Sequence, residues 1–179
     1  MKGLATFGGC LFLGLCHVQA SPVGWEKVKT EDGVTVYEKE VGEMVAFRGE
    51  GKIKAATGKL LYVIGDSAHW NEWIENFDKG QVLERKSPFH KVLYQAFDSP
   101  FPASDRDIVY EAKTRRDPAS GKILVEMRSV QHPKAPKTVG VRVSLKYTRY
   151  EITPLADGNL HVVLETLSDP GGSLPGFLV

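Results

Sequence analysis

The residues best placed to do chemistry lie in the stretch Ser99 to Tyr110, which reads Ser-Pro-Phe-Pro-Ala-Ser-Asp-Arg-Asp-Ile-Val-Tyr. Its two prolines favour a rigid, extended backbone, and the charged cluster at 105–107 then runs directly into a predicted strand. A charge buried there without a partner is costly. Two alternatives follow. The cluster is an ion-pair network that holds a loop, or Arg106 is a polar spot inside an otherwise apolar pocket.

Signatures of catalysis are few. The chain has no Gly-x-Ser-x-Gly elbow, no phosphate-cradling glycine loop and no His-Glu-x-x-His pair. The histidines beyond residue 20 are isolated, without the spacing of metal ligands, and both cysteines lie within the first twenty residues. We therefore predict no metal and no cofactor, and the sequence gives enzymatic activity no support.

The first twenty residues read as a secretory signal peptide. Lys2 supplies a positive start, an apolar run covers 4–18, and Val18-Gln19-Ala20 offers a cleavage site after Ala20. The run is too short for a membrane-spanning helix. A lipoprotein modified at Cys16 is a weaker alternative, because Leu15 precedes it where a small residue is expected. We expect an exported protein, periplasmic or secreted.

The remainder, 21–179, is expected to form one domain. Removing the signal takes away Lys2 and no acidic residue, which leaves 22 basic and 22 acidic side chains. A net charge of zero does not favour nucleic acid as a partner. Without cysteines, the exported domain must rest on its apolar core, and we expect a monomer.

The elements that must position these residues begin with a hairpin. Alternating strands are predicted over 34–40 and 44–53, joined around 41–43. A helix follows over 58–66, capped by Thr57, with Leu60, Leu61 and Ile64 on one face. A second short helix is predicted over 68–77. Its large apolar residues recur with helical spacing, at Trp70, Trp73, Ile74 and Phe77.

The rest of the chain reads as consecutive strands. They are predicted over 80–84, 91–97, 106–115, 122–130, 139–152 and 160–168. The apolar parity of 139–152 switches along its length, which predicts a bulge around 146–148. Strands surrounding a helical insertion indicate an α+β fold with one strongly curved antiparallel sheet. Periodicity alone leaves open whether the sheet's own side chains fill its inner face or leave a cavity.

Four motifs in order resemble the START (steroidogenic-acute-regulatory-related lipid-transfer) domain of the helix-grip superfamily, in its bacterial exported form. They are His-Trp-Asn-Glu-Trp-Ile at 69–74, the stretch 99–110, Tyr-Glu-Ile-Thr-Pro-Leu at 150–155 and Ser-Asp-Pro-Gly-Gly-Ser-Leu-Pro at 168–175. By the order and spacing of these motifs, the resemblance covers roughly 25–179, nearly all of the chain beyond the signal.

The resemblance implies a curved sheet gripping a long C-terminal lid helix, with a tunnel for one lipid or sterol-like molecule between them. Since the sequence ends at Val179, the lid helix is expected to be truncated here. Within this frame Arg106 is the buried polar feature, paired with a carboxylate or with the polar end of a ligand. The expected apolar wall consists of Trp73, Phe77, Tyr94, Met127, Leu164 and Phe177.

The function implied is binding, and transfer, of a lipid or other hydrophobic small molecule, with transient membrane contact. The alternative is a superfamily enzyme of the cyclase or aromatase type acting on a hydrophobic substrate. It requires an acid or base in the pocket, for which Asp107, His132 and Glu165 are the loose candidates. A third alternative is an interaction domain with a filled core.

Overall fold

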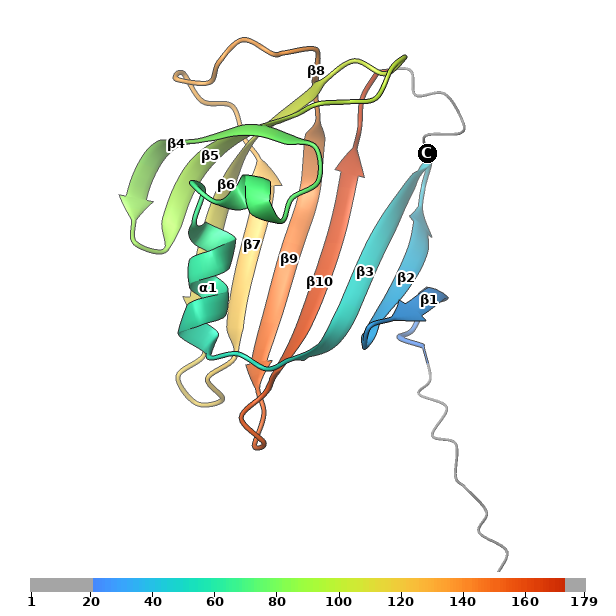
Figure 1. Ribbon diagram of the computed structural model, residues 1–179, viewed down its shortest axis with the longest axis vertical. Helices are drawn as coiled ribbons and strands as arrows, with labels where there is room; N and C mark the ends of the chain where they lie inside the picture. Colours follow the sequence, from blue (N-terminus) through green and yellow to red (C-terminus); the bar gives the residue numbers. More distant parts are fainter. Residues whose placement is uncertain (1–20, 173–179) are drawn as a thin grey trace, which may run out of the picture.

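The computed structural model describes residues 21–172, which are organised around one curved antiparallel sheet (Figure 1). Its long strands are β1 (Glu26–Glu31), β2 (Val34–Val41), β3 (Met44–Ile53), β4 (Phe77–Ser87), β5 (His90–Phe97), β6 (Arg106–Arg116), β7 (Ile123–Ser129), β9 (Ser144–Pro154) and β10 (Leu160–Asp169). They lie in the order β1-β2-β3-β10-β9-β7-β6-β5-β4, and the short β8 (Val141–Arg142) pairs in parallel with β6. The expected curved antiparallel sheet is thus confirmed.

One helix, α1 (Thr57–Gly65), carries the chain from β3 across the sheet to β4 at the far edge (Figure 1). On one side of this helix, Leu60, Leu61 and Ile64 are partly buried against a core from β7, β9 and β10. That core consists of Ile123, Val125, Ile152 and Leu160. We call the sheet face beneath α1 the inner face, and the opposite one the outer face. Within residues 21–172, no helix has the length and apolar character needed to cross a membrane.

The predicted bulge lies in β9. Tyr147 pairs with Leu167 on β10, whereas Leu145 pairs with Ser168, so Lys146 is an extra residue. An extra residue reverses which side chains face inward. Leu145 before the bulge and Thr148 after it therefore both reach the inner face. The parity switch in the sequence predicted this correctly.

The second predicted helix, 68–77, is wrong. The segment holds only a three-residue 3₁₀ turn, η1 (Trp70–Glu72), and the extended strand β4 already begins at Phe77. Asn76 has a φ of 55°, a left-handed conformation that cannot continue a right-handed helix. The predicted cap is also wrong, because Thr57 is the first helical residue and Ala56 before it makes no side-chain cap.

The outer face carries ion pairs that tie β2, β3 and β10 together. Arg48 on β3 lies 2.7 Å from the Glu50 carboxylate and 2.5 Å from that of Glu165 on β10. The buried Tyr37 on β2 donates a hydrogen bond to Glu50 at 3.0 Å. Since these side chains are largely shielded from water, the network contributes more than an exposed pair does.

We expect Glu50→Gln to lower the free energy of unfolding at neutral pH. We also expect the stability of this variant to fall less in acid than that of the wild type. Burial raises the pKa of Glu50, but hydrogen bonds from Arg48 and Tyr37 and the Arg48 charge outweigh it, leaving the pKa below 4.5. A lowered carboxylate pKa adds stability that is complete above pH 4.5 and disappears as the pH falls through the lowered value. Urea unfolding should show a loss of about 1 kcal/mol at pH 7 and a smaller difference in acid. Glu26→Gln, on an exposed strand, is the control, and an equal loss in both variants would contradict the expectation.

Candidate functional site

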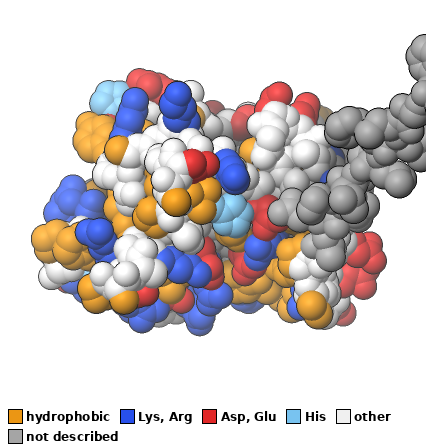
Figure 2. All heavy atoms as spheres, turned by 90° about the horizontal axis from the view of Figure 1, so that it is seen from below, with side chains coloured by type: hydrophobic (Ala, Val, Ile, Leu, Met, Phe, Trp, Pro, Cys, Tyr) orange, Lys and Arg blue, Asp and Glu red, His pale blue; other side chains and the backbone are white. Residues whose placement is uncertain are grey.

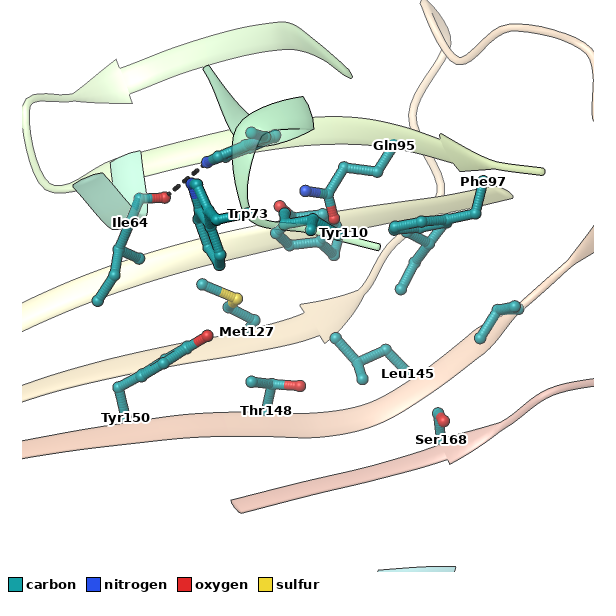
Figure 3. A pocket seen from close by; sticks show the side chains of 14 residues that line it. Ile64, Trp73, Gln95, Phe97, Tyr110, Met127, Leu145, Thr148, Tyr150 and Ser168 are labelled. Atoms are coloured by element: carbon teal, nitrogen blue, oxygen red, sulfur yellow. Dashed lines mark hydrogen bonds between the residues drawn. The ribbon is translucent and has the colours of Figure 1, made fainter. Parts of the chain in front are cut away.

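A cavity of about 350 Å³ lies on the inner face, between the sheet and the segment running from α1 through η1 to Ile74 (Figure 3). Its volume lies within the range of small-molecule sites in proteins. The lining comes from α1, the η1 segment, and β5, β6, β7, β9 and β10, with Val143 between β8 and β9. These residues are Ile64, Trp70, Trp73, Ile74, Gln95, Phe97, Ile108, Tyr110, Met127, Val143, Leu145, Thr148, Tyr150 and Ser168.

Trp70 holds the covering segment against the sheet. It is 3 % exposed, and its indole N–H donates to the Ile64 carbonyl at 3.1 Å, at the end of α1 (Figure 3). Its ring meets that of Phe77 edge to face, with centroids 6.0 Å apart. Gly80 on β4 provides the space, because a Cβ atom there would lie 3.0 Å from the indole. The roof of the cavity is therefore fixed by packing rather than by a helix.

The cavity wall is mostly apolar, with a few neutral polar groups. Figure 3 shows Gln95, Tyr110, Thr148, Tyr150 and Ser168 among the lining side chains. Burial raises the pKa of both Tyr110 and Tyr150, so their phenols stay protonated and can donate hydrogen bonds. Among the described residues, neither hydroxyl has a hydrogen-bond partner, whereas the Thr148 hydroxyl lies 2.8 Å from that of Thr166. This arrangement suits a hydrophobic molecule with an uncharged polar group.

No acid, base or metal cluster accompanies the cavity in the part of the chain that the structure describes. Its lining contains no carboxylate, imidazole, ammonium or guanidinium group. Asp107 and Glu165 face the outer side, and His132, in the loop after β7, lies 3.3 Å from Glu84 on β4. Over residues 21–172, no three His, Cys, Asp or Glu side chains gather into a possible metal site.

The structure places some of the predicted wall residues at the cavity and others elsewhere. Trp73 and Met127 line the cavity, and Phe77 packs beside it against Trp70 and Phe97. Leu164 pairs with the cavity residue Tyr150 but does not line the cavity itself. Tyr94 lies in a different cluster, and Phe177 falls outside the described residues. Whether these side chains contact a ligand stays a prediction.

Tyr94 belongs to the outer side of the sheet. It is 1 % exposed and packs with Leu83, Val92 and Val109, beneath the loop that follows β7. Val130 and Ala135 of that loop cover the cluster. The placement of Tyr94 on the cavity wall is therefore wrong, because the strands here are buried on both faces and apolar residues do not mark the inner one.

Arg106 does not line the cavity either. Its guanidinium donates to the Ser104 carbonyl and, at 3.4 Å, to the Ser99 hydroxyl. The buried charge of the cluster is Asp107, which pairs with Arg142 and accepts a hydrogen bond from the Val139 N–H at 3.0 Å. Of the two alternatives for the Asp-Arg-Asp cluster, the structure favours the one in which its charges hold loops, through one ion pair at Asp107 and hydrogen bonds at Asp105 and Arg106.

Several lining residues were absent from the predicted wall although the sequence contained a signal for them. Ile108 and Tyr110 share one face of β6, and Leu145 and Tyr150 share the inner face once the bulge is counted. For Gln95 no such signal exists, because a polar residue in a buried strand gives no sign of facing a cavity.

A family model described as START domain matches residues 15–179 of this chain. Among curated proteins, the chain is 27 % identical to an uncharacterized protein of Pseudomonas aeruginosa, covering 86 % of this chain and 76 % of that protein. It is 25 % identical to the phosphatidylcholine transfer protein of Bos taurus, covering 89 % and 76 %. With the ceramide transfer protein of Xenopus laevis it shares 26 % identity over 87 % of this chain, which spans only 28 % of that longer protein.

Solved structures agree in fold. A STAR-related lipid transfer protein from Xanthomonas axonopodis superposes with a TM-score of 0.74 at 26 % identity, covering 87 % of each chain. Human StAR-related lipid transfer protein 5 superposes with a TM-score of 0.78 at 22 % identity, covering 88 % of this chain and 78 % of that one. The second likeness, at its lower identity, concerns the fold alone.

Proposed function

Because this chain belongs to the START domain family, we propose that it binds one lipid or other hydrophobic small molecule in the cavity of the inner face. The observation that carries the proposal is a cavity of about 350 Å³ with an apolar wall and a few neutral polar groups. Burial of apolar ligand surface against such a wall supplies the affinity, and the polar groups orient the ligand. The relatives named for transferring phosphatidylcholine and ceramide support the same class of ligand.

Transfer, rather than storage, is part of the proposal and requires a transient contact with a membrane. Support comes from the loop between β5 and β6, where the Phe101 side chain is 96 % exposed. The ring lies between two prolines, and because the exposure of an apolar ring to water is unfavourable, it can enter a lipid surface. The protein then acts as a monomeric carrier.

Export completes the proposal. A secretory signal over 1–20, cleaved after Ala20, directs the domain 21–179 to the periplasm or the medium. N-terminal sequencing of protein recovered from cell fractions tests this directly, since Ser21 is then the first residue. No observation among the described residues favours the enzyme alternative.

Native mass spectrometry of protein purified from its own cells tests binding. We expect a bound mass of a few hundred daltons, on the order of a sterol or single-chain lipid, lost on denaturation. Delipidated protein should regain a bound mass after incubation with mixed lipids. A folded protein that stays free of ligand in both experiments would contradict the proposal and favour an interaction domain.

A further inference from the structure

A second pocket, of about 250 Å³, lies under α1 on the side of Trp70 away from the cavity described above. Four side chains separate the two spaces and line both: Ile64, Trp70, Tyr110 and Met127. The other residues that line the second pocket are Gly58, Leu61, Tyr62, Gly65, Pro88, Phe89, Lys91, Leu93, Ala112, Thr114 and Val125. Its wall is therefore largely apolar, like that of the first.

The second pocket differs from the first in charge. Lys91 is the one charged side chain among the described residues that line it. Its cross-strand partner is Arg85 on β4, so two cations lie side by side. Burial, and then the Arg85 charge, lower the pKa of Lys91. Like charges directly opposite each other destabilise a sheet.

Neither cation is neutralised within the described chain. Arg85 and Lys91 make no ion pair with a carboxylate in residues 21–172, in contrast to Arg48 and Arg142. Gly65 is the last residue of α1, and a Cβ atom added to it would lie 4.0 Å from the Lys91 ammonium. The ammonium is therefore close to the C-terminal end of the helix. Carbonyl groups at a helix end compensate one nearby cation in part, but not two.

The pocket mouth is apolar as well as basic. Tyr62 on α1 and Phe89 in the β4–β5 turn both line the pocket and are 67 % and 65 % exposed, which puts them at its rim. In the view from below, basic and hydrophobic side chains lie side by side over the part of the surface toward α1, β4 and β5 (Figure 2). A ligand that enters here meets both kinds of group.

We propose that this pocket is a second binding site, for a single-chain amphiphile with an anionic head such as a long-chain carboxylate. The head lies between Lys91 and Arg85, where it relieves their repulsion and receives charge-assisted hydrogen bonds. The hydrocarbon chain lies along Leu61, Leu93 and Val125. The small volume suits one chain rather than two. This site does not rest on the proposed function, since neither Lys91 nor Arg85 lines the first cavity.

Calorimetric titration of the protein with dodecanoate, below its micellar concentration and at pH 7.5, tests the site. We expect Lys91→Met and Arg85→Gln each to weaken dodecanoate binding about tenfold, because each removes one charge-assisted bond. Lys113→Met is the matched control and should bind like the wild type, since Lys113 pairs with Glu111 and does not line the pocket. Dodecan-1-ol, which has the same chain and no charge, should bind at least tenfold more weakly than dodecanoate.

Two further variants assign the binding to one pocket or the other. Thr114→Trp, which narrows only the second pocket, should abolish dodecanoate binding, and Leu145→Trp, which narrows only the first, should leave it intact. Equal binding by Lys91→Met and wild type, or loss of binding in Leu145→Trp alone, would overturn the second site. The latter result would leave the first cavity as the binding site, so the two proposals fail separately.

Discussion

Replacing Asp107 by Ala should lower the free energy of unfolding by about 3 kcal/mol, measured by urea denaturation at pH 7. Asp107 has no exposed surface, and its carboxylate is paired with Arg142 and hydrogen bonded to the Val139 N–H at 3.0 Å and, at 3.4 Å, to the Tyr94 hydroxyl. Its removal leaves these donors without an acceptor. Since the Arg142 side chain is 36 % exposed, water compensates in part, which keeps the loss near the lower end for buried pairs.

The neighbouring carboxylate in the same cluster provides the control. The Asp105 carboxylate accepts one exposed hydrogen bond, from the Ser99 N–H at 3.0 Å, so Asp105→Ala should cost about 1 kcal/mol or less. Asp107→Asn keeps the shape and one acceptor and should fall between the two Ala variants. Equal losses in Asp105→Ala and Asp107→Ala would show that the buried ion pair of Asp107 contributes nothing beyond one exposed hydrogen bond.

Local patterns predicted much of this fold. Alternation located the β2–β3 hairpin, and the parity change in 139–152 located the bulge at Lys146, because both depend on which neighbours along one strand face the core. The spacing of Leu60, Leu61 and Ile64 predicted the packed side of α1 for the same reason. These features are encoded over a few residues.

The misplaced residues depend on contacts that are distant in sequence. On β5 and β6 both faces are covered, one by the segment after α1 and the other by the loop after β7, so parity cannot tell the cavity side from the other. Arg106 therefore looked like the buried charge, although Asp107 is the one that meets Arg142, thirty-five residues away. Helical spacing at 70–77 was misleading, because Trp70 is buried by Gly80 and Phe77 rather than by a helix face.

Leu145→Trp should weaken uptake of a fluorescent sterol probe by about ten- to a hundredfold, because the sterol binds in the inner-face cavity. Leu145 lies just before the bulge, where its side chain points into the cavity among Met127, Thr148 and Ser168 (Figure 3). An indole there occupies space that the ligand needs, and overpacking costs about 1–3 kcal/mol, which corresponds to roughly five- to 150-fold in affinity and so brackets the expected loss. The stability of the ligand-free protein should change little, since the indole enters a space that no side chain fills.

The matched control places the same indole on the other face of the sheet. Leu124 on β7 is half-buried like Leu145, but it faces outward, beside Glu151. Leu124→Trp should bind the probe like the wild type, while both variants keep the far-ultraviolet circular dichroism of the parent. If the two variants lose binding equally, the loss reflects a general disturbance of the sheet. If neither loses it, the ligand lies outside the inner-face cavity, and the second pocket under α1 becomes the first place to look, because it shares Trp70 and Met127 with that cavity but not Leu145.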